Sequence, residues 1–444
     1  MKQKTTYNCE NCAYQTPKWL GCCPGCKQWN TIQEAGASHY VLAKSNHTPT
    51  TPLTDLSSID LPVKERFITG IGEWDRVTGG GIVPGSFMML TGDPGIGKST
   101  LLLHIAYSVG SSTKVLYFSS EESLEQVKQR ALRIEKLSPN VLFSDTAQLD
   151  SIIATAQEHK PGLVIIDSIQ NCYTAEQHAI PGSIGQLKEA AFKLMRLAKE
   201  HSIALLVSGH ITKDGVMAGP KTLEHMVDAV FYLQGEDRFQ IRMLRSVKNR
   251  FGTVNELGFF EMQELGLQEL HNINAYLLEE ASYNVGSVLS SFIEGSRPII
   301  IELQALTIAT KYPSAQRVIS SVEYNQVILI AAILEKFLKI NFSSQDIFFK
   351  ISGGFKIKCS GLDLGIALAL LSSYYQKTLP ERSLVLGEIS LTGHIKPING
   401  IAMLVKEAEK FGIKRCFVAH NQQIESSIRI IKLQHVYDLL ELFA

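Results

Sequence analysis

The sequence SFMMLTGDPGIGKSTLLLH, residues 86–104, contains the strongest structural signal in the chain. Its first seven residues form an apolar run typical of a buried strand, and residues 92–99 fit the pattern G-x4-G-K-S/T. The residues from Thr100 onward predict a helix that begins directly after this glycine-rich loop. A loop of this composition between a strand and a helix is the setting that a phosphate-binding P-loop requires.

Each residue type in this loop suits a nucleotide and its metal ion. Glycines let backbone N–H groups close around phosphates, and the following helix adds the positive end of its dipole. We expect Lys98 to reach the β- and γ-phosphates of ATP and the Ser99 hydroxyl to ligate Mg²⁺. The residues that we predict to surround the nucleotide are Gly92, Asp93, Pro94, Gly95, Ile96, Gly97, Lys98, Ser99 and Thr100.

Apolar runs that predict strands alternate with amphipathic segments on both sides of this loop. Such alternation predicts an α/β domain with a largely parallel sheet, which we assign to residues 61–272. Residues 273–444 have a second set of strand-like and helix-like segments and form a second α/β domain in this interpretation. Further predicted strands cover residues 114–120, 162–168, 203–210, 228–234, 285–295, 297–307 and 347–351, and predicted helices cover 183–200, 325–338 and 363–374.

Acidic residues end two of the predicted strands, at the sheet edge where α/β proteins bind their ligands. Asp167 ends one strand, and we predict that it completes the Mg²⁺ shell as a Walker B carboxylate. Glu121 and Glu122 follow another strand, and one of them, preferably Glu121, orients or deprotonates the attacking water. The alternative is that both glutamates stabilise the start of the next helix through its dipole. His210 is a candidate sensor of the γ-phosphate or a structural histidine.

Five of the eight cysteines lie within the first 26 residues. Two CxxC pairs, ten residues apart, predict a closed tetrahedral zinc site with a structural role. We therefore assign residues 1–35 to a four-cysteine zinc finger and the Ser-, Thr- and Pro-rich residues 36–60 to a linker. Trp19 and Trp29 flank the second pair, where they either pack over the metal or stack on bases. The predicted zinc ligands are Cys9, Cys12, Cys23 and Cys26, with Cys22 as a bystander.

The charges of the chain are balanced. Its 444 residues contain 43 Lys+Arg and 43 Asp+Glu, so the formal net charge is zero. Without an overall positive field, a nucleic-acid partner has to meet a local basic patch. No stretch approaches 18 uninterrupted apolar residues, and the N-terminus has no apolar signal segment. We therefore expect a cytoplasmic protein without a membrane partner.

Five further segments occur together with the glycine-rich loop: residues 17–21, 66–75, 79–81, 223–228 and the KNRFG sequence at 248–252. Together these motifs resemble the bacterial RadA family, also called Sms, of RecA-like recombination and repair ATPases. The resemblance covers nearly all of the chain. It implies a RecA-like P-loop NTPase core between a zinc finger and a Lon-protease-like domain of the ribosomal S5 domain 2-like type.

The same resemblance implies an activity. Members of this family are DNA-dependent ATPases that form rings, here expected to be hexameric, on single-stranded and branched DNA. The expected role is branch migration and strand extension during recombination and DNA repair, together with a RecA-type recombinase.

Positive charge is concentrated near KNRFG. The resemblance implies that Lys248 and Arg250 engage DNA and that Arg250 acts on nucleotide across a subunit boundary, since a guanidinium fork matches phosphoryl oxygens. The alternative is a solvated basic face. Lys213 and Lys221 lie in a Gly-containing loop, which we expect to hold the DNA backbone unless it is a plain surface loop. The basic residues of the segment are Arg238, Arg242, Arg245, Lys248 and Arg250.

The C-terminal segment resembles Lon proteases around residues 360–367 and 387–400, but it departs from them at the catalytic dyad. The alignment places Asp363 where Lon has its serine nucleophile and Ala402 where Lon has its lysine. A carboxylate without a cationic partner cannot form an acyl-enzyme, so we predict that this domain is proteolytically inactive.

Two rival functions of the whole protein stay open: an ATP-dependent protease, and a nucleotide-switched scaffold without translocation.

Overall fold

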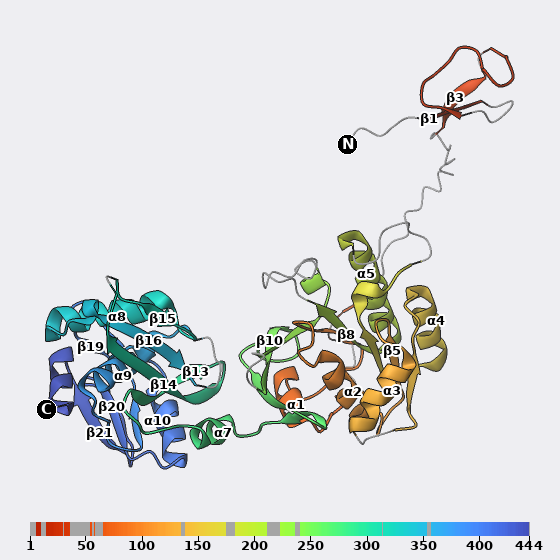
Figure 1. Cartoon of the computed structure of the whole chain (residues 1–444). Helices are drawn as coiled ribbons and strands as arrows, with labels where there is room; N and C mark the ends of the chain where they lie inside the picture. Colours follow the sequence, from red (N-terminus) through yellow and green to blue (C-terminus); the bar gives the residue numbers. More distant parts are fainter. Residues whose placement is uncertain are drawn as a thin grey trace. The chain divides into compact units, whose positions relative to one another are not determined.

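We analysed a computed structural model of the chain (Figure 1). The chain divides into two compact units, Met1–Val63 and Lys64–Ala444. The structure describes residues 6–9, 15–29, 31–35, 54–55, 57, 65–134, 138–174, 183–210, 223–235, 240–312, 314–352 and 357–443.

The first unit contains a small antiparallel sheet in the order β2–β1–β3. Cys9 and Cys23 are buried beside it, with Tyr7 and Cys26 packed against them. Apolar burial in so small a core stabilises a fold only weakly, so metal binding by the cysteines is expected to supply the remaining stability. The strands are β1 (Thr6–Cys9), β2 (Gln15–Thr16) and β3 (Ile32–Ala35).

The second unit begins with a mixed sheet in the order β12–β11–β10–β9–β4–β8–β7–β5–β6. Strands β4 to β9 pair in parallel, and β9 to β12 pair antiparallel. The predicted strands of this domain are confirmed as β4, β5, β7, β8 and β9, whereas β6 and β10 to β12 were not predicted. The bounds are β4 Phe87–Gly92, β5 Val115–Ser119, β6 Val141–Ser144, β7 Leu163–Asp167, β8 Ala204–His210, β9 Ala229–Gly235, β10 Ile241–Asn249, β11 Leu257–Gln263 and β12 Gly266–Glu269.

Helices cover both faces of this sheet (Figure 1). Along the central strand β4, Met88 and Leu90 belong to one buried cluster, and Phe87 and Met89 belong to another. The first cluster includes α1 to α3 and the second includes α4 and α5. This alternation explains why the parallel strands read as continuous apolar runs. The helices are α1 (Gly72–Thr78), α2 (Lys98–Val109), α3 (Leu124–Ile134), α4 (Leu149–His159) and α5 (Ile184–His201).

Helix α2 begins at Lys98, two residues before the predicted start at Thr100. Its N-cap, Gly97, has a φ of 111°, a left-handed conformation that favours glycine. A Cβ atom on Gly97 would lie 2.7 Å from Cε of Met262, so β11 packs closely against this turn. Because of the earlier start, Lys98 and Ser99 belong to the first turn of the helix, whose N–H groups point towards the loop.

The second unit ends with another mixed sheet, in the order β15–β16–β14–β13–β17–β20–β21. Ile299 and Ile301 face the cluster that contains α8 and α9, and Ile300 faces the cluster that contains α10. The predicted strands and helices of this segment are confirmed as β13, β14, β16, α8 and α9. The bounds are α7 Ile273–Glu279, β13 Ser287–Glu294, β14 Arg297–Ala309, β15 Arg317–Ile319, α8 Tyr324–Leu338, β16 Gln345–Ile351, α9 Asp363–Tyr375, β17 Ser383–Val385, β18 Glu388–Ile389, β19 Ile395–Lys396, α10 Ile401–Lys410, β20 Arg415–Ala419 and β21 Arg429–Leu433.

Both sheets and their helices confirm the predicted α/β fold class. Within the described ranges, no helix combines the length and the apolar character that crossing a membrane requires. The chain separates into the compact units Met1–Val63 and Lys64–Ala444, and neither unit is divided further. The domain boundaries predicted at residues 35, 60 and 272 therefore stay predictions.

Candidate nucleotide site and metal site

Lys98 lies at the first residue of α2, and its side chain folds back over the glycine-rich loop. Its Nζ donates hydrogen bonds to the carbonyl oxygens of Gly92 and Asp93, each at 2.9 Å, and the residue is 5% exposed. Burial lowers the pKa of this ammonium group, while Asp167, Glu121 and Asp93 act in the opposite direction. Phosphate oxygens of a bound nucleotide would replace the carbonyl oxygens and form stronger, charge-assisted hydrogen bonds.

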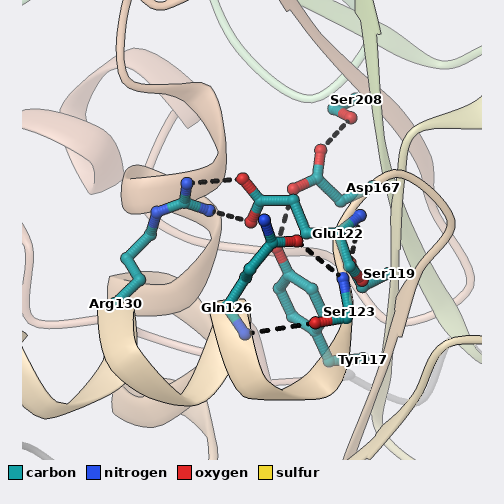
Figure 2. A network of polar contacts seen from close by, with 8 residues as sticks. All are labelled: Tyr117, Ser119, Glu122, Ser123, Gln126, Arg130, Asp167 and Ser208. Carbon is teal, nitrogen blue, oxygen red and sulfur yellow. Dashed lines mark hydrogen bonds and ion pairs between the residues drawn. The ribbon is translucent and has the colours of Figure 1, made fainter.

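Two hydroxyl groups orient Asp167 at the end of β7 (Figure 2). Tyr117 donates to Oδ2 at 2.9 Å, and Ser208 Oγ donates to Oδ1 at 2.5 Å. Burial raises the pKa of Tyr117 well above its ordinary value, and Asp167 adds to the rise, so the phenol stays a donor. The three residues come from β5, β7 and β8. Each carboxylate oxygen keeps a lone pair, so Asp167 suits the predicted role of holding a magnesium-bound water.

The two glutamates after β5 have different surroundings. Glu122 forms a bidentate pair with Arg130, whose Nη2 lies 2.6 Å from Oε1 and whose Nη1 contacts Oε2 (Figure 2). Glu121 is exposed, accepts a hydrogen bond from Ser168 Oγ, and acts electrostatically on Lys98. The geometry therefore favours Glu121 over Glu122 as the catalytic base, an assignment that stays a prediction.

One arginine that was not predicted as a site residue contacts the P-loop. Arg242, on β10, donates through Nε to the carbonyl oxygen of Ile96 at 3.2 Å. The contact joins residues 146 positions apart in the sequence, so no local motif marks it. Arg242 therefore positions the loop that is predicted to hold the phosphates.

The cysteine cluster agrees with a zinc site. The sulfur atoms of Cys9, Cys23 and Cys26 all lie within 4.8 Å of one another, and those of Cys9 and Cys26 are 3.6 Å apart. Thiolates around a tetrahedral zinc ion, with Zn–S bonds of about 2.3 Å, lie about 3.8 Å apart, so the donor set fits this metal. Cys12, the fourth predicted ligand, lies outside the described residues. Cys22 is not a member of the cluster, as expected for a bystander.

The basic side chains of the segment that ends in KNRFG have different partners in the structure. Alternate residues of β10 face opposite sides, and a bulge near Lys248 changes the register. Arg245 pairs with Glu294, whereas Lys248 Nζ donates to the carbonyl oxygens of Val227, at 2.8 Å, and of Glu224. The basic side chains described here thus have separate partners, although Lys248 and Arg250 lie close enough to interact electrostatically. The expectation of a local basic patch stays a prediction.

Among the basic residues of this segment that the structure describes, Arg250 is largely exposed, with 61% of its side chain open to solvent. Its Nη1 lies 3.3 Å from Oδ1 of the buried Asp228. Asp228 is also held by Lys199 at 2.6 Å and by the N–H of Phe87 at 3.0 Å. Asp228 therefore keeps other partners if Arg250 turns towards a ligand.

The KNRFG motif also packs against residues 79–81. Arg66 donates from Nη1 to the carbonyl oxygen of Gly79 at 2.7 Å and from Nη2 to that of Phe251 at 2.9 Å. A Cβ atom on Gly79 would lie 3.0 Å from Cα of Gly252. Arg66 thus joins the glycine segment 79–81 to KNRFG, although the two are far apart in the sequence. This role of Arg66 was not predicted from the sequence.

Other predicted residues cannot be placed. Lys213, Lys221 and Arg238 lie outside the described residues, and of His210 the structure describes the backbone within β8. Their assigned roles stay predictions.

The Lon-like segment places Asp363 at the start of α9, where it is buried. Its Oδ1 accepts a hydrogen bond from Gln326 at 2.7 Å, and its Oδ2 accepts one from the N–H of Ile389 at 3.2 Å. Ser360 Oγ donates to Glu388 at 2.9 Å, and Ala402 is exposed on α10. The absence of proteolytic activity stays a prediction.

Three family models match parts of the chain. A model described as an AAA domain matches residues 65–216, and a rubredoxin metal binding domain model matches residues 7–34. A model for subunit ChlI of Mg-chelatase matches residues 317–422. The first two matches agree with a P-loop ATPase core and an N-terminal zinc ribbon.

Relatives match nearly the whole chain. DNA repair protein RadA of Listeria monocytogenes serovar 1/2a is 39% identical over 451 residues, which cover 99% of this chain and 98% of that protein. DNA repair protein RadA of Bacillus subtilis is 40% identical, covering 94% of this chain and 93% of that protein. Among solved structures, the RadB recombinase gives a TM-score of 0.37 at 22% identity, over 46% of this chain and 100% of that chain. On the sequence relatives, the chain belongs to the RadA family of DNA repair proteins.

Proposed function

We propose that this protein is a DNA-dependent ATPase that acts in recombination and DNA repair. The observation that carries the proposal is the convergence of Lys98, Asp167 and Glu121 where β4, β7 and β5 end. Its setting would be the cytoplasm, on single-stranded and branched DNA, together with a RecA-type recombinase. The printed names of its relatives support a role in repair.

The reaction transfers the γ-phosphoryl group of ATP to water and yields ADP and inorganic phosphate. Lys98 exchanges its carbonyl partners for β- and γ-phosphate oxygens and stabilises the charge that they carry. Glu121 takes a proton from the attacking water, while Tyr117 and Ser208 hold Asp167 in one orientation. Ser99 and Asp167 would hold Mg²⁺, which would supply Lewis-acid stabilisation of the phosphates.

Hydrolysis would drive movement along DNA through a hexameric ring. In such a ring the exposed guanidinium of Arg250 would leave Asp228 and reach either the γ-phosphate bound by a neighbouring subunit or the DNA. Arg250 is largely exposed, and the buried Asp228 keeps Lys199 and the N–H of Phe87 as partners, so we expect this exchange to cost about 1 kcal/mol or less. Coupling of hydrolysis to DNA in this way would support branch migration.

The proposal is tested by the rate of ATP hydrolysis with and without single-stranded DNA. Wild type and Lys128→Ala, a control that removes an exposed lysine from α3, should both be stimulated by DNA. Lys98→Ala should keep its fold and lose turnover. Nucleotide binding without turnover in wild type would instead indicate a switch. Cleavage of a fluorogenic peptide that disappears in Ser360→Ala would indicate a protease.

A further inference from the structure

The zinc ribbon, defined here as residues 7–34, carries two exposed indole rings. Trp19 is 57% exposed and Trp29 is 74% exposed, whereas Trp74, the third tryptophan of the chain, is fully buried in the second unit. Both exposed rings contact Gly21: a Cβ atom there would lie 3.7 Å from Cη2 of Trp19 and 3.6 Å from Cζ3 of Trp29. More than half of each side chain is therefore open to solvent.

The backbone around these rings is held in place. Trp29 pairs with Cys22 in an antiparallel bridge, next to the cysteine cluster. On the other side, Thr16 Oγ1 donates to the carbonyl oxygen of Lys18 at 3.0 Å and lies 3.3 Å from its N–H group. The rings are thus presented by a turn that the metal would rigidify, which lowers the entropic cost of binding a partner.

The charges on this surface are positive. Lys18 and Lys27 are exposed, and residues 15–29, all of which the structure describes, contain neither Asp nor Glu. Aromatic rings that accept any base, combined with lysines that contact phosphates, are the components of a surface for single-stranded nucleic acid. An acidic protein segment would need only the lysines, and an apolar one would need only the apolar area. Neither would need the faces of two aromatic rings.

We propose that the zinc ribbon binds single-stranded DNA by stacking bases on Trp19 and Trp29, while Lys18 and Lys27 contact the backbone. This inference rests on the proposed function and adds to it a contact outside the ATPase core. Stacking reads no sequence, so the surface would accept any single strand.

Intrinsic fluorescence of the full chain tests this inference, because the buried Trp74 contributes an emission that DNA does not reach. Titration with oligothymidylate should quench the emission of Trp19 and Trp29. Trp19→Leu and Trp29→Leu should each weaken binding about tenfold, and the two Trp→Phe variants should weaken it less. Leu20→Ala is the matched control, since it removes an exposed aliphatic side chain from the same surface. Zinc content should stay the same in every variant, and the Phe variants carry the test if a Leu variant loses zinc.

The outcomes separate this inference from the proposed function. DNA-stimulated hydrolysis with unchanged tryptophan emission, and with normal DNA binding by the double Leu variant, would overturn the stacking surface alone. A loss of binding in Leu20→Ala equal to that in Trp29→Leu would point to an apolar protein-docking surface and would overturn it too. Absence of both DNA binding and DNA stimulation in wild type would overturn both proposals.

Discussion

The guanidinium group of Arg130 contacts both carboxylate oxygens of Glu122, with Nη2 at 2.6 Å from Oε1 (Figure 2). Arg130 belongs to α3, and Glu122 belongs to the turn that connects β5 with this helix. Because both carboxylate oxygens are engaged, Glu122 fixes the helix to the strand end. This pairing agrees with the prediction that Glu121, its neighbour, acts on the attacking water.

We expect Glu121→Gln to lower kcat for ATP hydrolysis by about 100- to 10,000-fold, the usual contribution of a general base. The amide keeps the size of the side chain and can still accept a hydrogen bond from Ser168, but it cannot accept a proton. Calorimetric titration with a non-hydrolysable ATP analogue should show nearly unchanged affinity.

Glu122→Gln is the matched control for this experiment. It breaks the pair with Arg130, so a lower melting temperature is expected, with turnover within about tenfold of wild type. If Glu122→Gln abolished turnover and Glu121→Gln did not, the roles of the two glutamates would be reversed.

Cys9→Ser should release zinc, because Cys9 is a buried member of the thiol cluster. Elemental analysis should find one zinc ion per chain in wild type and in Cys22→Ser, and less in Cys9→Ser. We expect the fold of the first unit to depend on this metal, whereas unfolding of Lys64–Ala444 should keep its midpoint. Stoichiometric zinc in purified Cys9→Ser would refute the ligand assignment.

Lys248 and Arg250 should behave differently when each is replaced by alanine. Lys248→Ala removes the donor to the carbonyl oxygens of Glu224 and Val227, so we expect a stability loss of about 1 to 2 kcal/mol. Arg250→Ala removes a largely exposed side chain and leaves Asp228 paired with Lys199, so stability should change little while DNA-stimulated hydrolysis falls.

Mixed rings then distinguish a catalytic role of Arg250 from a DNA-binding role. If Arg250 completes the site of a neighbouring subunit, wild-type subunits should restore part of the turnover of Arg250→Ala. If it contacts DNA phosphates, the dependence of affinity on salt should flatten by about one unit of slope. Normal stability of Lys248→Ala and normal activity of Arg250→Ala would refute both assignments.

The positions of the parallel strands β4, β5, β7, β8 and β9 could be predicted because those strands read as continuous apolar runs. The parallel strand β6 was missed because it is a short edge strand with partly exposed residues. The antiparallel strands β10 to β12 could not be predicted in this way. In β10 the charged residues Arg242 and Arg245 interrupt the apolar run, and β12 has only four residues. The sequence shows a cluster of positive charges here, but it does not show their partners. In the structure Arg242 contacts the carbonyl oxygen of Ile96, and Arg245 pairs with Glu294.

The candidate site was predictable as far as it is local. The P-loop motif is contiguous, and Asp167 and Glu121 stand at the ends of recognisable strands. Tyr117, Ser208 and Arg242 were missed because each joins the site through a contact between residues 41 to 146 positions apart. Hydroxyl groups that orient a carboxylate have no sequence signature of their own, so only the tertiary fold reveals them.

Asp363 provides a pH-dependent test of the Lon-like domain. Burial raises the pKa of this carboxyl group to about 6, with a smaller contribution from Glu388, against hydrogen bonds from Gln326 and from the N–H of Ile389. An unfolded aspartate has a pKa of about 4. The folded state therefore binds the proton more tightly, and the contribution of Asp363 to stability is greatest below about pH 4. That contribution is lost as the pH rises through about 6, and it stays constant above this range.

Asp363→Asn removes this titration, so the difference in unfolding free energy between wild type and variant should change by about 2 to 3 kcal/mol between pH 4 and pH 8, with the wild type relatively weaker at pH 8. Amide hydrogen exchange of the α9 peptide, Asp363–Tyr375, is the suitable measurement, because it reports on this helix and not on the whole multidomain chain. In Glu388→Gln the pH midpoint should move downward, since one neighbouring negative charge is gone. Parallel pH profiles for wild type and Asp363→Asn would show that the buried carboxylate stays ionised across this pH range. A buried ionised carboxylate needs a cationic partner. The argument against a Lon-type dyad, which rests on the lack of such a partner, would then fail.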